Sequence, residues 1–368
     1  MNLSKILNKY SCYAFVCFWL CLPAYSAGPE PKLIASGFEL PWSVELLDAN
    51  TVLVSERAGK IKQMDIATRS VKNITGVWPV WFSGQGGLLD LAIDPEPSSV
   101  NKWVYATYSK PSSGGASTAL ARFKVVDGKV SELEELFVSN AVFTDGRHFG
   151  SRIAFDDNVE GNTAKSGYVF FTSGDRGERD SAQDLSSHAG AVLRLHKDGS
   201  IPIDNPFVGQ AKAMPEIWSY GHRNPQGISF DYQTGKLWLI EHGPRGGDEI
   251  NLVKKAANYG WPVISYGKEY WGPFDVGEGT HREGMEQPVK YYDPSIAPGS
   301  LLFHKGKLYS GALKLQHLNR VDIDASGKAS NEVRLFGELK QRIRDVTTGP
   351  DGYIFFVTDQ GNLYQFVP

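Results

Sequence analysis

The amino-acid sequence predicts an all-β fold, and more specifically a six-bladed β-propeller. The 368-residue chain is rich in glycine (39) and proline (20), while long segments with helical periodicity are scarce. Such a composition suits many short strands joined by tight turns. A hairpin of two short strands also recurs six times along the chain. Because no linker-like break in composition appears, we expect a single domain over residues 28–368.

Each predicted repeat has a short apolar strand, a few turn residues, and a second strand rich in β-branched and aromatic residues. A lone hairpin is marginally stable, whereas six radially arranged units hide most of their edges. A pair of β-sandwiches would not explain six similar copies. The hairpins are expected at residues 42–47 with 52–55, 88–93 with 103–108, 152–155 with 167–172, 227–230 with 236–240, 300–303 with 307–310, and 345–348 with 353–358.

Additional strands are expected to complete these units and to close the ring. Third strands are predicted at residues 60–64, 118–125 and 190–195. The segment at residues 32–36 is expected to pair with the C-terminal strand at residues 363–366. Such a pairing would join the two ends of the chain and leave few open edges.

The first 27 residues are predicted to be a Sec-type signal peptide. Lys5 and Lys9 form a basic start, residues 13–22 are apolar but too short to span a bilayer, and small residues follow at 24–27. All three cysteines lie in this segment, so we expect no disulfide, thiolate metal site or cysteine nucleophile in the mature protein. We therefore expect a periplasmic or secreted protein whose mature chain has no membrane span. The formal net charge of −3 argues against nucleic acid as a partner.

The stretch from residue 221 to residue 262 carries the most informative motifs. It contains GHRNPQG, then EHGPRGGDEIN, then NYGWP, around two short apolar strands. In propellers, binding sites are formed by polar groups at the ends of rigid strands. The alternative interpretation of this stretch is a hairpin with a solvated loop and no binding site. The three motifs in this order resemble the central signature of the soluble quinoprotein glucose/sorbosone dehydrogenases. Within that family they are most similar to bacterial aldose sugar dehydrogenases that use pyrroloquinoline quinone (PQQ), and the resemblance extends from about residue 40 to the C-terminus.

The motif GRHFGSR at residues 146–152 contains a candidate catalytic histidine. A histidine at the end of a strand can act as a general base, because its pKa lies near working pH, or can simply be satisfied by a backbone carbonyl. The family places its catalytic histidine in a similar context, so the resemblance implies that His148 is the base. Arg147 stands where the glucose dehydrogenase branch has an acidic residue, which favours the aldose sugar dehydrogenase branch.

The resemblance also implies residues that contact the quinone. Gln85 matches the family glutamine that hydrogen-bonds PQQ, and Arg223 and Asn224 match the pair near the quinone carbonyl. A fixed guanidinium suits an oxygen that gains negative charge, so Arg223 is expected to be catalytic as well. Tyr270 lies near the family's quinone-contacting tyrosine. Without the family, Gln85 would be a loop residue and the Arg-Asn pair a cap of strand ends.

Three cations late in the chain are expected to bind the carboxylates of PQQ: Lys314, Arg342 and Arg344. Alternation along a strand places Arg342 and Arg344 on one face, where they repel each other unless an anion lies between them. PQQ carries three carboxylates and would meet that need. A solvated basic strand end is the alternative.

The resemblance implies two calcium sites made of oxygen donors, which is the ligand type that Ca²⁺ prefers. The carbonyls of Gly243 and Pro244 would hold the calcium that bridges to PQQ. Glu249 and Tyr259 would hold a structural calcium.

The family's activity is the PQQ- and Ca²⁺-dependent oxidation of an aldose sugar at the anomeric carbon to the lactone. His148 would remove the hydroxyl proton while the C1 hydride passes to the quinone, and an external acceptor would take the electrons. A calcium-dependent lactonase of the gluconolactonase/paraoxonase type is one rival, which would need a central calcium held by carboxylates. A non-enzymatic propeller that binds carbohydrate or protein is another.

Overall fold

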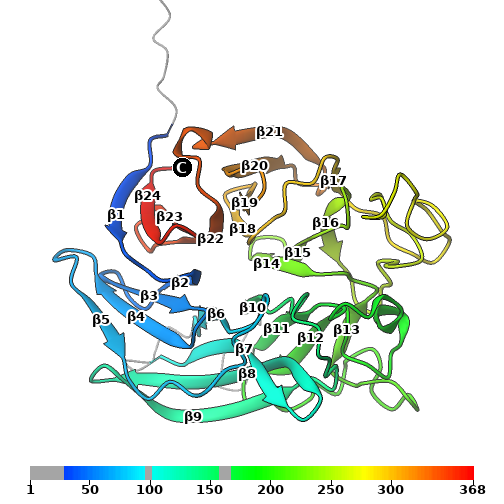
Figure 1. The fold of residues 1–368 in the computed structure, drawn as a ribbon, viewed down its shortest axis with the longest axis horizontal. Coiled ribbons are helices and arrows are strands. Elements are labelled where there is room, and N and C mark those ends of the chain that lie inside the picture. Colours follow the sequence, from blue (N-terminus) through cyan, green and yellow to red (C-terminus); the bar gives the residue numbers. More distant parts are fainter. Residues whose placement is uncertain (1–28, 96–101, 157–166) are drawn as a thin grey trace, which may run out of the picture.

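The computed structural model describes residues 29–95, 102–156 and 167–368, and its strands form six antiparallel four-stranded sheets arranged in a ring (Figure 1). The six predicted hairpins are all present, and each forms the two innermost strands of one blade (Figure 1). The predicted six-bladed β-propeller is therefore confirmed. The predicted signal peptide, residues 1–27, lies outside the described residues.

In blades 1 to 5 the strands follow chain order from the centre of the ring to its rim (Figure 1). Blade 1 has β2 (Pro41–Leu46), β3 (Thr51–Glu56), β4 (Lys60–Asp65) and β5 (Val71–Ile74); blade 2 has β6 (Leu88–Ile93), β7 (Val104–Ser112), β8 (Gly115–Val126) and β9 (Lys129–Val138); blade 3 has β10 (Ile153–Asp156), β11 (Tyr168–Ser173), β12 (Ala191–His196) and β13 (Ile217–Tyr220). Blade 4 has β14 (Pro225–Asp231), β15 (Lys236–Glu241), β16 (Asp248–Val253) and β17 (Lys290–Tyr292); blade 5 has β18 (Leu302–His304), β19 (Lys307–Ala312), β20 (His317–Ile323) and β21 (Ala329–Leu335).

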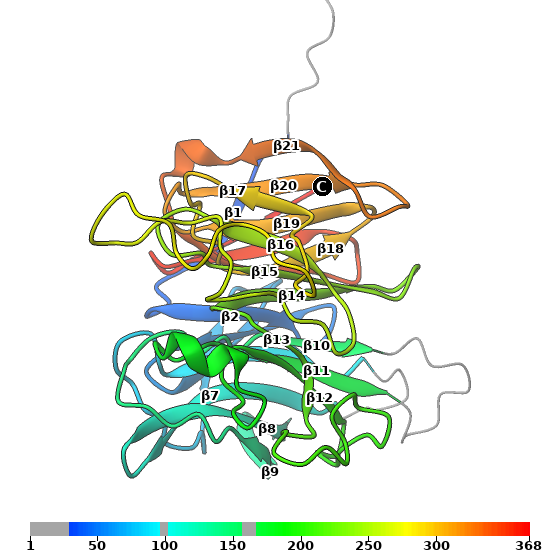
Figure 2. The same ribbon diagram turned by 90° about the vertical axis from the view of Figure 1, so that its right-hand side faces the viewer.

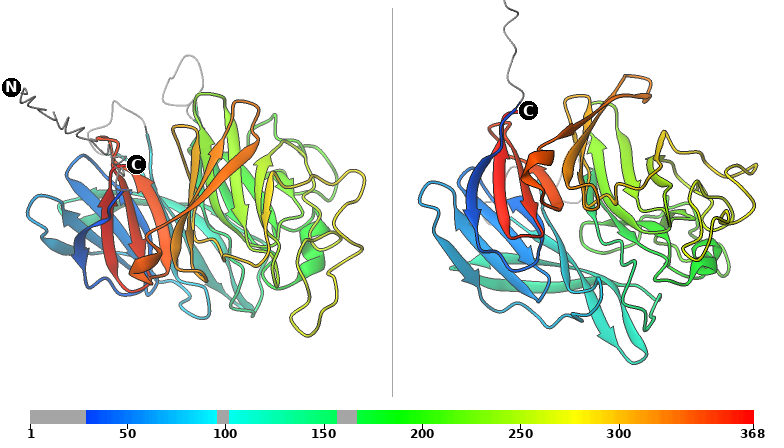
Figure 3. Two further views of the ribbon diagram at one scale, coloured as in Figure 1. Left: turned by 90° about the horizontal axis from the view of Figure 1, so that it is seen from above. Right: turned by 45° about the horizontal axis from the view of Figure 1, so that its top comes forward.

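Blade 6 closes the ring with strands from both ends of the chain. Its order is β1 (Lys32–Ser36), β24 (Asn362–Phe366), β23 (Ile354–Thr358) and β22 (Ile343–Thr348). Lys32 lies opposite Gln365 and Leu33 opposite Tyr364, as the sequence predicted for this closure. Figure 3 shows the N-terminal strand in blue beside the C-terminal strands in red. The pairing satisfies the backbone of both terminal strands and so fastens the ring.

The apolar core is divided among the six gaps between neighbouring blades. A separate cluster of buried side chains fills each gap, such as Leu53 with Leu91 between blades 1 and 2, or Val52 with Phe355 between blades 1 and 6. Second strands such as β3 are buried on both faces because a neighbouring blade covers each side. This explains why these strands are continuous apolar runs rather than alternating ones.

A single buried arginine, Arg152, joins blade 3 to all the other blades at the centre of the ring. Its side chain is 4% exposed, and its guanidinium carbon lies 3.9 Å from the Trp42 ring centroid. Nη1 donates to Asp90 Oδ1 (2.8 Å) and Asp345 Oδ1 (2.7 Å). The other donors reach the carbonyls of Gln226, Gly299 and Arg344. These partners lie in or next to blades 1, 2, 4, 5 and 6, so one guanidinium holds the inner edges together.

Replacing Arg152 with methionine should lower the free energy of unfolding by about 3–5 kcal/mol, because Asp90 and Asp345 would stay buried without their cation. Burial already raises the pKa of Asp90 to about 7 and raises that of Asp345, while Arg152 opposes both shifts. Without Arg152 these folded-state pKa values would rise further, so the variant should regain stability as the pH falls from about 7 to 5.

Denaturant unfolding at both pH values measures this effect. Arg320→Met is the control, because Arg320 is partly exposed and its nearest carboxylate contact, to Asp322, is 3.6 Å long; its loss should cost about 0–1 kcal/mol. Equal stabilities of the two variants would show that Arg152 does not hold the blades together.

Two long connections lie on the same side of the ring (Figure 2). One follows β11 and contains the 3₁₀ helix η1 (Arg179–Gln183), and the other joins β16 to β17. Arg179 in the first binds Glu269 in the second through two hydrogen bonds of 2.6 and 2.8 Å. A second 3₁₀ helix, η2 (Gly337–Leu339), precedes β22. Neither helix, in the part of the chain that the structure describes, is long or apolar enough to cross a membrane.

Candidate functional site

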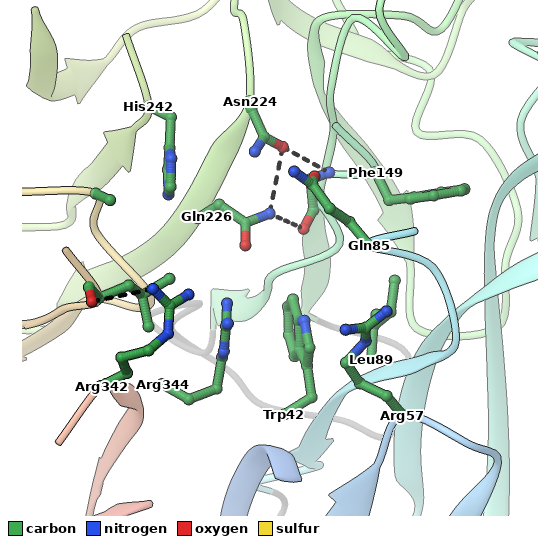
Figure 4. A pocket seen from close by; sticks show the side chains of 13 residues that line it. Trp42, Arg57, Gln85, Leu89, Phe149, Asn224, Gln226, His242, Arg342 and Arg344 are labelled. Carbon is green, nitrogen blue, oxygen red and sulfur yellow. Dashed lines mark hydrogen bonds between the residues drawn. The ribbon is translucent and has the colours of Figure 1, made fainter. Parts of the chain in front are cut away.

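A cavity of about 240 Å³ is lined by side chains that come from several blades (Figure 4). Trp42, which stacks on Arg152, forms part of its wall. Three kinds of polar or flat side chain line the cavity: the guanidiniums of Arg57, Arg342 and Arg344, the amides of Gln85, Asn224 and Gln226, and the rings of Trp42, Phe149 and His242. The cavity thus offers flat apolar surfaces, amide hydrogen bonds and an excess of positive charge.

Four of the residues predicted to bind PQQ line this one cavity, although they come from different blades: Gln85, Asn224, Arg342 and Arg344. Arg223 and His148 lie beside it rather than in its wall, and both are almost fully buried. The Tyr270 hydroxyl lies 3.5 Å from Arg223 Nη2. Lys314 follows the lining residue Leu313, and its own side chain is exposed at the rim.

The cations of the cavity outnumber the carboxylates that pair with them. Asp359 accepts from Arg342 Nε (2.7 Å) and from Arg344 Nε (2.8 Å), so one carboxylate serves two guanidiniums. Burial would raise the pKa of Asp359, but Arg344 and Arg342 outweigh it and hold that pKa below its usual value. Arg57 makes no ion pair among the described residues, and its Nη2 donates to the carbonyls of Gly84 and Gly86. Such an arrangement favours a bound anion with several acceptor oxygens.

His148 forms a buried pair with a carboxylate that the sequence analysis did not single out, Asp175. The two atoms, His148 Nδ1 and Asp175 Oδ1, lie 2.6 Å apart, and Trp261 Nε1 donates to Asp175 Oδ2 (2.8 Å). Burial would raise the pKa of Asp175, but its hydrogen bond with His148, assisted by Arg223, lowers it. An ionised Asp175 places the imidazole proton on Nδ1, which leaves Nε2 as the basic nitrogen.

The surroundings of His148 keep its imidazole neutral. Burial is the main cause of its lowered pKa, Asp175 opposes that shift, and the positive charge of Arg223 adds to it. Nε2 makes no hydrogen bond within the described part of the chain. The arrangement therefore presents a neutral, oriented base, which is what proton removal from a hydroxyl requires.

The backbone explains why the two predicted motifs around Gln85 and His148 meet. The amide N–H of Gln85 donates to the Gly146 carbonyl (2.6 Å), and the Gln85 side-chain oxygen accepts from the His148 N–H (2.8 Å). A Cβ at Gly84, whose φ is +56°, would lie 2.3 Å from the Gly146 carbonyl oxygen. Only glycine permits this close approach.

The backbone carbonyls of Gly243 and Pro244 lie next to Arg223 and Tyr270. Arg223 Nη1 donates to the Gly243 carbonyl (2.8 Å), and the Tyr270 hydroxyl donates to the Pro244 carbonyl (2.9 Å). Both carbonyl oxygens are hard ligands of the kind that calcium prefers. A calcium ion held by these two carbonyls would replace both hydrogen bonds.

The second predicted metal site coincides with a small cavity of about 20 Å³, lined by Glu241, Glu249 and Tyr259 among others. Asn251 Nδ2 donates to both carboxylates at 3.2 Å. Burial, followed by repulsion from Glu241, raises the pKa of Glu249 to about 8. The Tyr259 hydroxyl donates to the Leu252 carbonyl (2.6 Å), so the ligand that this residue can offer is its own carbonyl. Two converging carboxylates fit a bound cation.

Four residues of the site were not predicted from the sequence: Trp42, Arg57, Asp175 and Asp359. A common signal links Arg57 and Asp175 to two other residues of the site, His242 and Asp359. Each of these four follows the second strand of its blade by one or two residues. Trp42 does not follow this pattern. It lies within the inner strand β2, where an aromatic residue is expected to belong to the core.

The chain matches the family model described as glucose/sorbosone dehydrogenase over residues 38–365. It is 36% identical to the aldose sugar dehydrogenase YliI of Escherichia coli, over 96% of each chain. It is 30% identical to quinoprotein glucose dehydrogenase B of Acinetobacter calcoaceticus, over 66% of this chain and 54% of that protein. The crystal structure of the soluble aldose sugar dehydrogenase from Escherichia coli in the apo-form superimposes with a TM-score of 0.85 at 34% identity, over 92% of this chain and 99% of that one.

Proposed function

Because the chain belongs to the glucose/sorbosone dehydrogenase family, we propose that it oxidises aldose sugars at the anomeric carbon with PQQ and Ca²⁺. It is an oxidoreductase that acts on the CH–OH group of sugars, as its similarity to an aldose sugar dehydrogenase over nearly the whole chain shows. The product would be the lactone, and the electrons would pass to an external acceptor. We further propose that residues 1–27 direct export to the periplasm, which N-terminal sequencing of the exported protein would test.

The observation that carries the PQQ proposal is the charge of the cavity. Arg57, Arg342 and Arg344 face a space of about 240 Å³, with Asp359 as the carboxylate that pairs with two of them. A trianion would neutralise the excess and use the guanidinium donors as paired hydrogen bonds. The flat Trp42 and Phe149 rings suit a flat conjugated ligand. A neutral sugar alone would not need so many cations.

The oxygen donors at Gly243, Pro244, Glu249 and Tyr259 fit calcium in type. We propose that the Gly243 and Pro244 carbonyls hold the ion next to the quinone, in exchange for their hydrogen bonds to Arg223 and Tyr270. We assign the structural ion to the pocket beside Glu249, where Glu241 adds a second carboxylate that the sequence analysis did not include.

In the proposed mechanism, His148 transfers the proton and Arg223 stabilises the negative charge that develops. When bound, PQQ supplies the hydride-accepting quinone. His148 Nε2 would take the proton of the anomeric hydroxyl, while Asp175 holds Nδ1 and stabilises the imidazolium that forms. Arg223, which has no carboxylate ion pair among the described residues, would stabilise negative charge that develops during the reaction. Trp261 and the backbone N–H of Gly177 fix Asp175 in turn.

The carboxylates of Asp90 and Asp345 at the centre of the ring argue against the alternative that the protein is a calcium-dependent lactonase. A lactonase of that type would use carboxylates near the ring axis to hold calcium, but here Asp90 and Asp345 bind the Arg152 guanidinium at 2.8 and 2.7 Å. Their second oxygens accept from the backbone N–H groups of Ile153 and Val44. These carboxylates therefore serve the fold.

Replacing Arg344 with alanine should weaken PQQ binding by about 1.5–3 kcal/mol, the scale of a hydrogen bond to a charged group. Much of the turnover should return at saturating PQQ, because Arg344 binds a carboxylate rather than the reacting carbon. Isothermal calorimetry of the cofactor-free protein with PQQ measures the affinity. Arg334→Ala is the matched control, since Arg334 is exposed and lies 3.6 Å from Glu332 in β21. Equal PQQ affinities of wild type and Arg344→Ala would remove the support for a cationic PQQ site.

A further inference from the structure

Arg176 is a fully buried arginine that contacts the backbone on the N-terminal side of His148. Its guanidinium donates to three backbone carbonyls, those of Arg147, Asp145 (2.8 Å) and Ala116 (3.2 Å). Two of these carbonyls belong to the segment that leads into His148. Arg176 also directly follows Asp175, whose carboxylate binds the imidazole.

The same guanidinium holds the C-terminal side of His148 as well. Its central carbon lies 3.4 Å from the centroid of the Phe149 ring, so the ring stacks against the cation. Phe149 in turn lines the cavity. Arg176 therefore clamps the residues immediately before and after His148.

The backbone at His148 requires such support. His148 has a φ of +53°, and Ser151 a φ of +79°, in the left-handed region that non-glycine residues rarely adopt. Arg176 itself has a φ of +57°. Left-handed non-glycine residues cost free energy and persist only where the surrounding contacts enforce them.

The charge of Arg176 is not explained by an ion pair. Its hydrogen bonds, within the residues that the structure describes, go to carbonyls alone, and its Nε has no partner. Burial lowers the pKa of Arg176 to about 10, although Asp145 and Asp175 oppose the shift. Burying a cation without a carboxylate partner is costly. Such a cost is expected where a precise local geometry is needed for function.

We propose that Arg176 is a positioning residue for His148, which fixes the backbone before it and the ring after it so that the imidazole keeps its bond to Asp175. This inference rests on the proposed role of His148 as the catalytic base. A guanidinium suits the task because its planar fork reaches several carbonyls at once and its face stacks on a ring, whereas an ammonium group does neither.

The Arg176→Lys variant keeps the positive charge but loses the planar guanidinium that donates to three carbonyls at once. We expect kcat with a saturating aldose to fall roughly 10- to 100-fold, the effect of a small misplacement of a reacting group. The PQQ affinity and the KM for the sugar should each change less than about threefold, because Arg176 is fully buried and does not line the cavity. The matched control is Arg194→Lys, because Arg194 is another buried arginine of blade 3 and its guanidinium carbon lies 3.6 Å from the centroid of the Tyr168 ring. That variant should keep the wild-type kcat.

Titration of His148 by NMR in the cofactor-free protein gives a readout that a purely structural role would not change. The charged or titratable groups that face His148 are Asp175, Arg147, Arg223, His242 and, through Arg147, Asp145. Since burial lowers the pKa of His148, a loosened and better hydrated imidazole in Arg176→Lys should titrate at higher pH, closer to about 6.5.

The two readouts separate the inference from the proposed function. Wild-type protein without PQQ-dependent activity would refute the proposed function, while the NMR titration would still report on the clamp. Unchanged kcat together with an unchanged His148 titration in Arg176→Lys would overturn the inference. Should Arg176→Lys fail to fold, Arg176→Gln, whose amide keeps two planar donors, is measured in the same way.

Discussion

Replacing His148 with alanine is expected to lower kcat by roughly 10²- to 10⁴-fold, the usual contribution of a general base. The cause is the loss of Nε2, the basic nitrogen of an imidazole whose Nδ1 is held by Asp175 at 2.6 Å. PQQ should remain bound, because His148 does not line the cavity and the guanidiniums of Arg342 and Arg344 are untouched. Steady-state kinetics at saturating PQQ and sugar, with the bound PQQ measured by its absorbance, give both quantities.

His188→Gln is the matched control for this variant. His188 is also buried in blade 3 and also contacts a carboxylate, Glu216, at 3.2 Å, but it lies away from the cavity. Its replacement should leave kcat unchanged. A His148→Ala enzyme that oxidises sugars at the wild-type rate would make His148 structural and would refute the mechanism.

The pH dependence follows from the environment of His148. The base must be neutral to accept a proton, and burial lowers the pKa of His148 despite the opposing effect of Asp175. In the cofactor-free protein the imidazole should therefore become protonated only at a pH below the usual pKa of about 6.5. Its contribution to stability is present above that pH and declines as the pH falls, because the unfolded chain binds the proton more readily.

Removing calcium should abolish sugar oxidation, and only calcium together with PQQ should restore it. The expected loss is the whole activity, because the proposed ligands at Gly243 and Pro244 lie next to Arg223 and Tyr270. The experiment is dialysis against a chelator followed by addition of Ca²⁺, Mg²⁺, PQQ, or Ca²⁺ and PQQ combined. Mg²⁺ should restore less activity than Ca²⁺, since it demands shorter bonds and stricter octahedral geometry. Full activity of a protein shown to be free of both calcium and PQQ would contradict the proposal.

The fold was predictable from the sequence because propeller blades are built from local hairpins. Each hairpin joins strands that are close in the chain, and the alternation of apolar strands with glycine-rich turns marks them directly. Even the closure of the ring was predictable, since β1 and β24 are the strands left over at the two ends. The strand boundaries differ from prediction by a few residues, as at Arg342, which precedes β22 rather than lying in it.

The site was predictable only in part, because its contacts cross between blades. Gln85 and Asn224 were predicted from their resemblance to a family, and Arg342 and Arg344 from their spacing and charge. The structure brings all four to one cavity. The hydrogen-bond partners of Arg152 lie up to 193 residues away in the sequence, and no local sequence pattern predicts such contacts. The contact of Arg57 with the Gly84 and Gly86 carbonyls depends in the same way on how blades 1 and 2 pack.

Asp175 is the clearest case of a residue that reasoning from the sequence could have found. Asp175 lies two residues after the end of β11. In the same way, His242 lies one residue after the end of β15, and Asp359 lies one residue after the end of β23. The end of each second strand in a blade therefore points to the site, and reading those positions together would have added Asp175 and Arg57 to the candidates.

The most direct test of the central claim is an absorbance titration under anaerobic conditions. The purified cofactor-free protein is mixed with one equivalent of PQQ and excess Ca²⁺, and an aldose such as glucose is then added. PQQ should bind, and the sugar should convert the oxidised quinone spectrum to the reduced one. The His148→Ala variant should bind PQQ but reduce it roughly 10²- to 10⁴-fold more slowly. Failure of the wild-type protein to bind PQQ, or a bound quinone that no aldose reduces, would contradict the account.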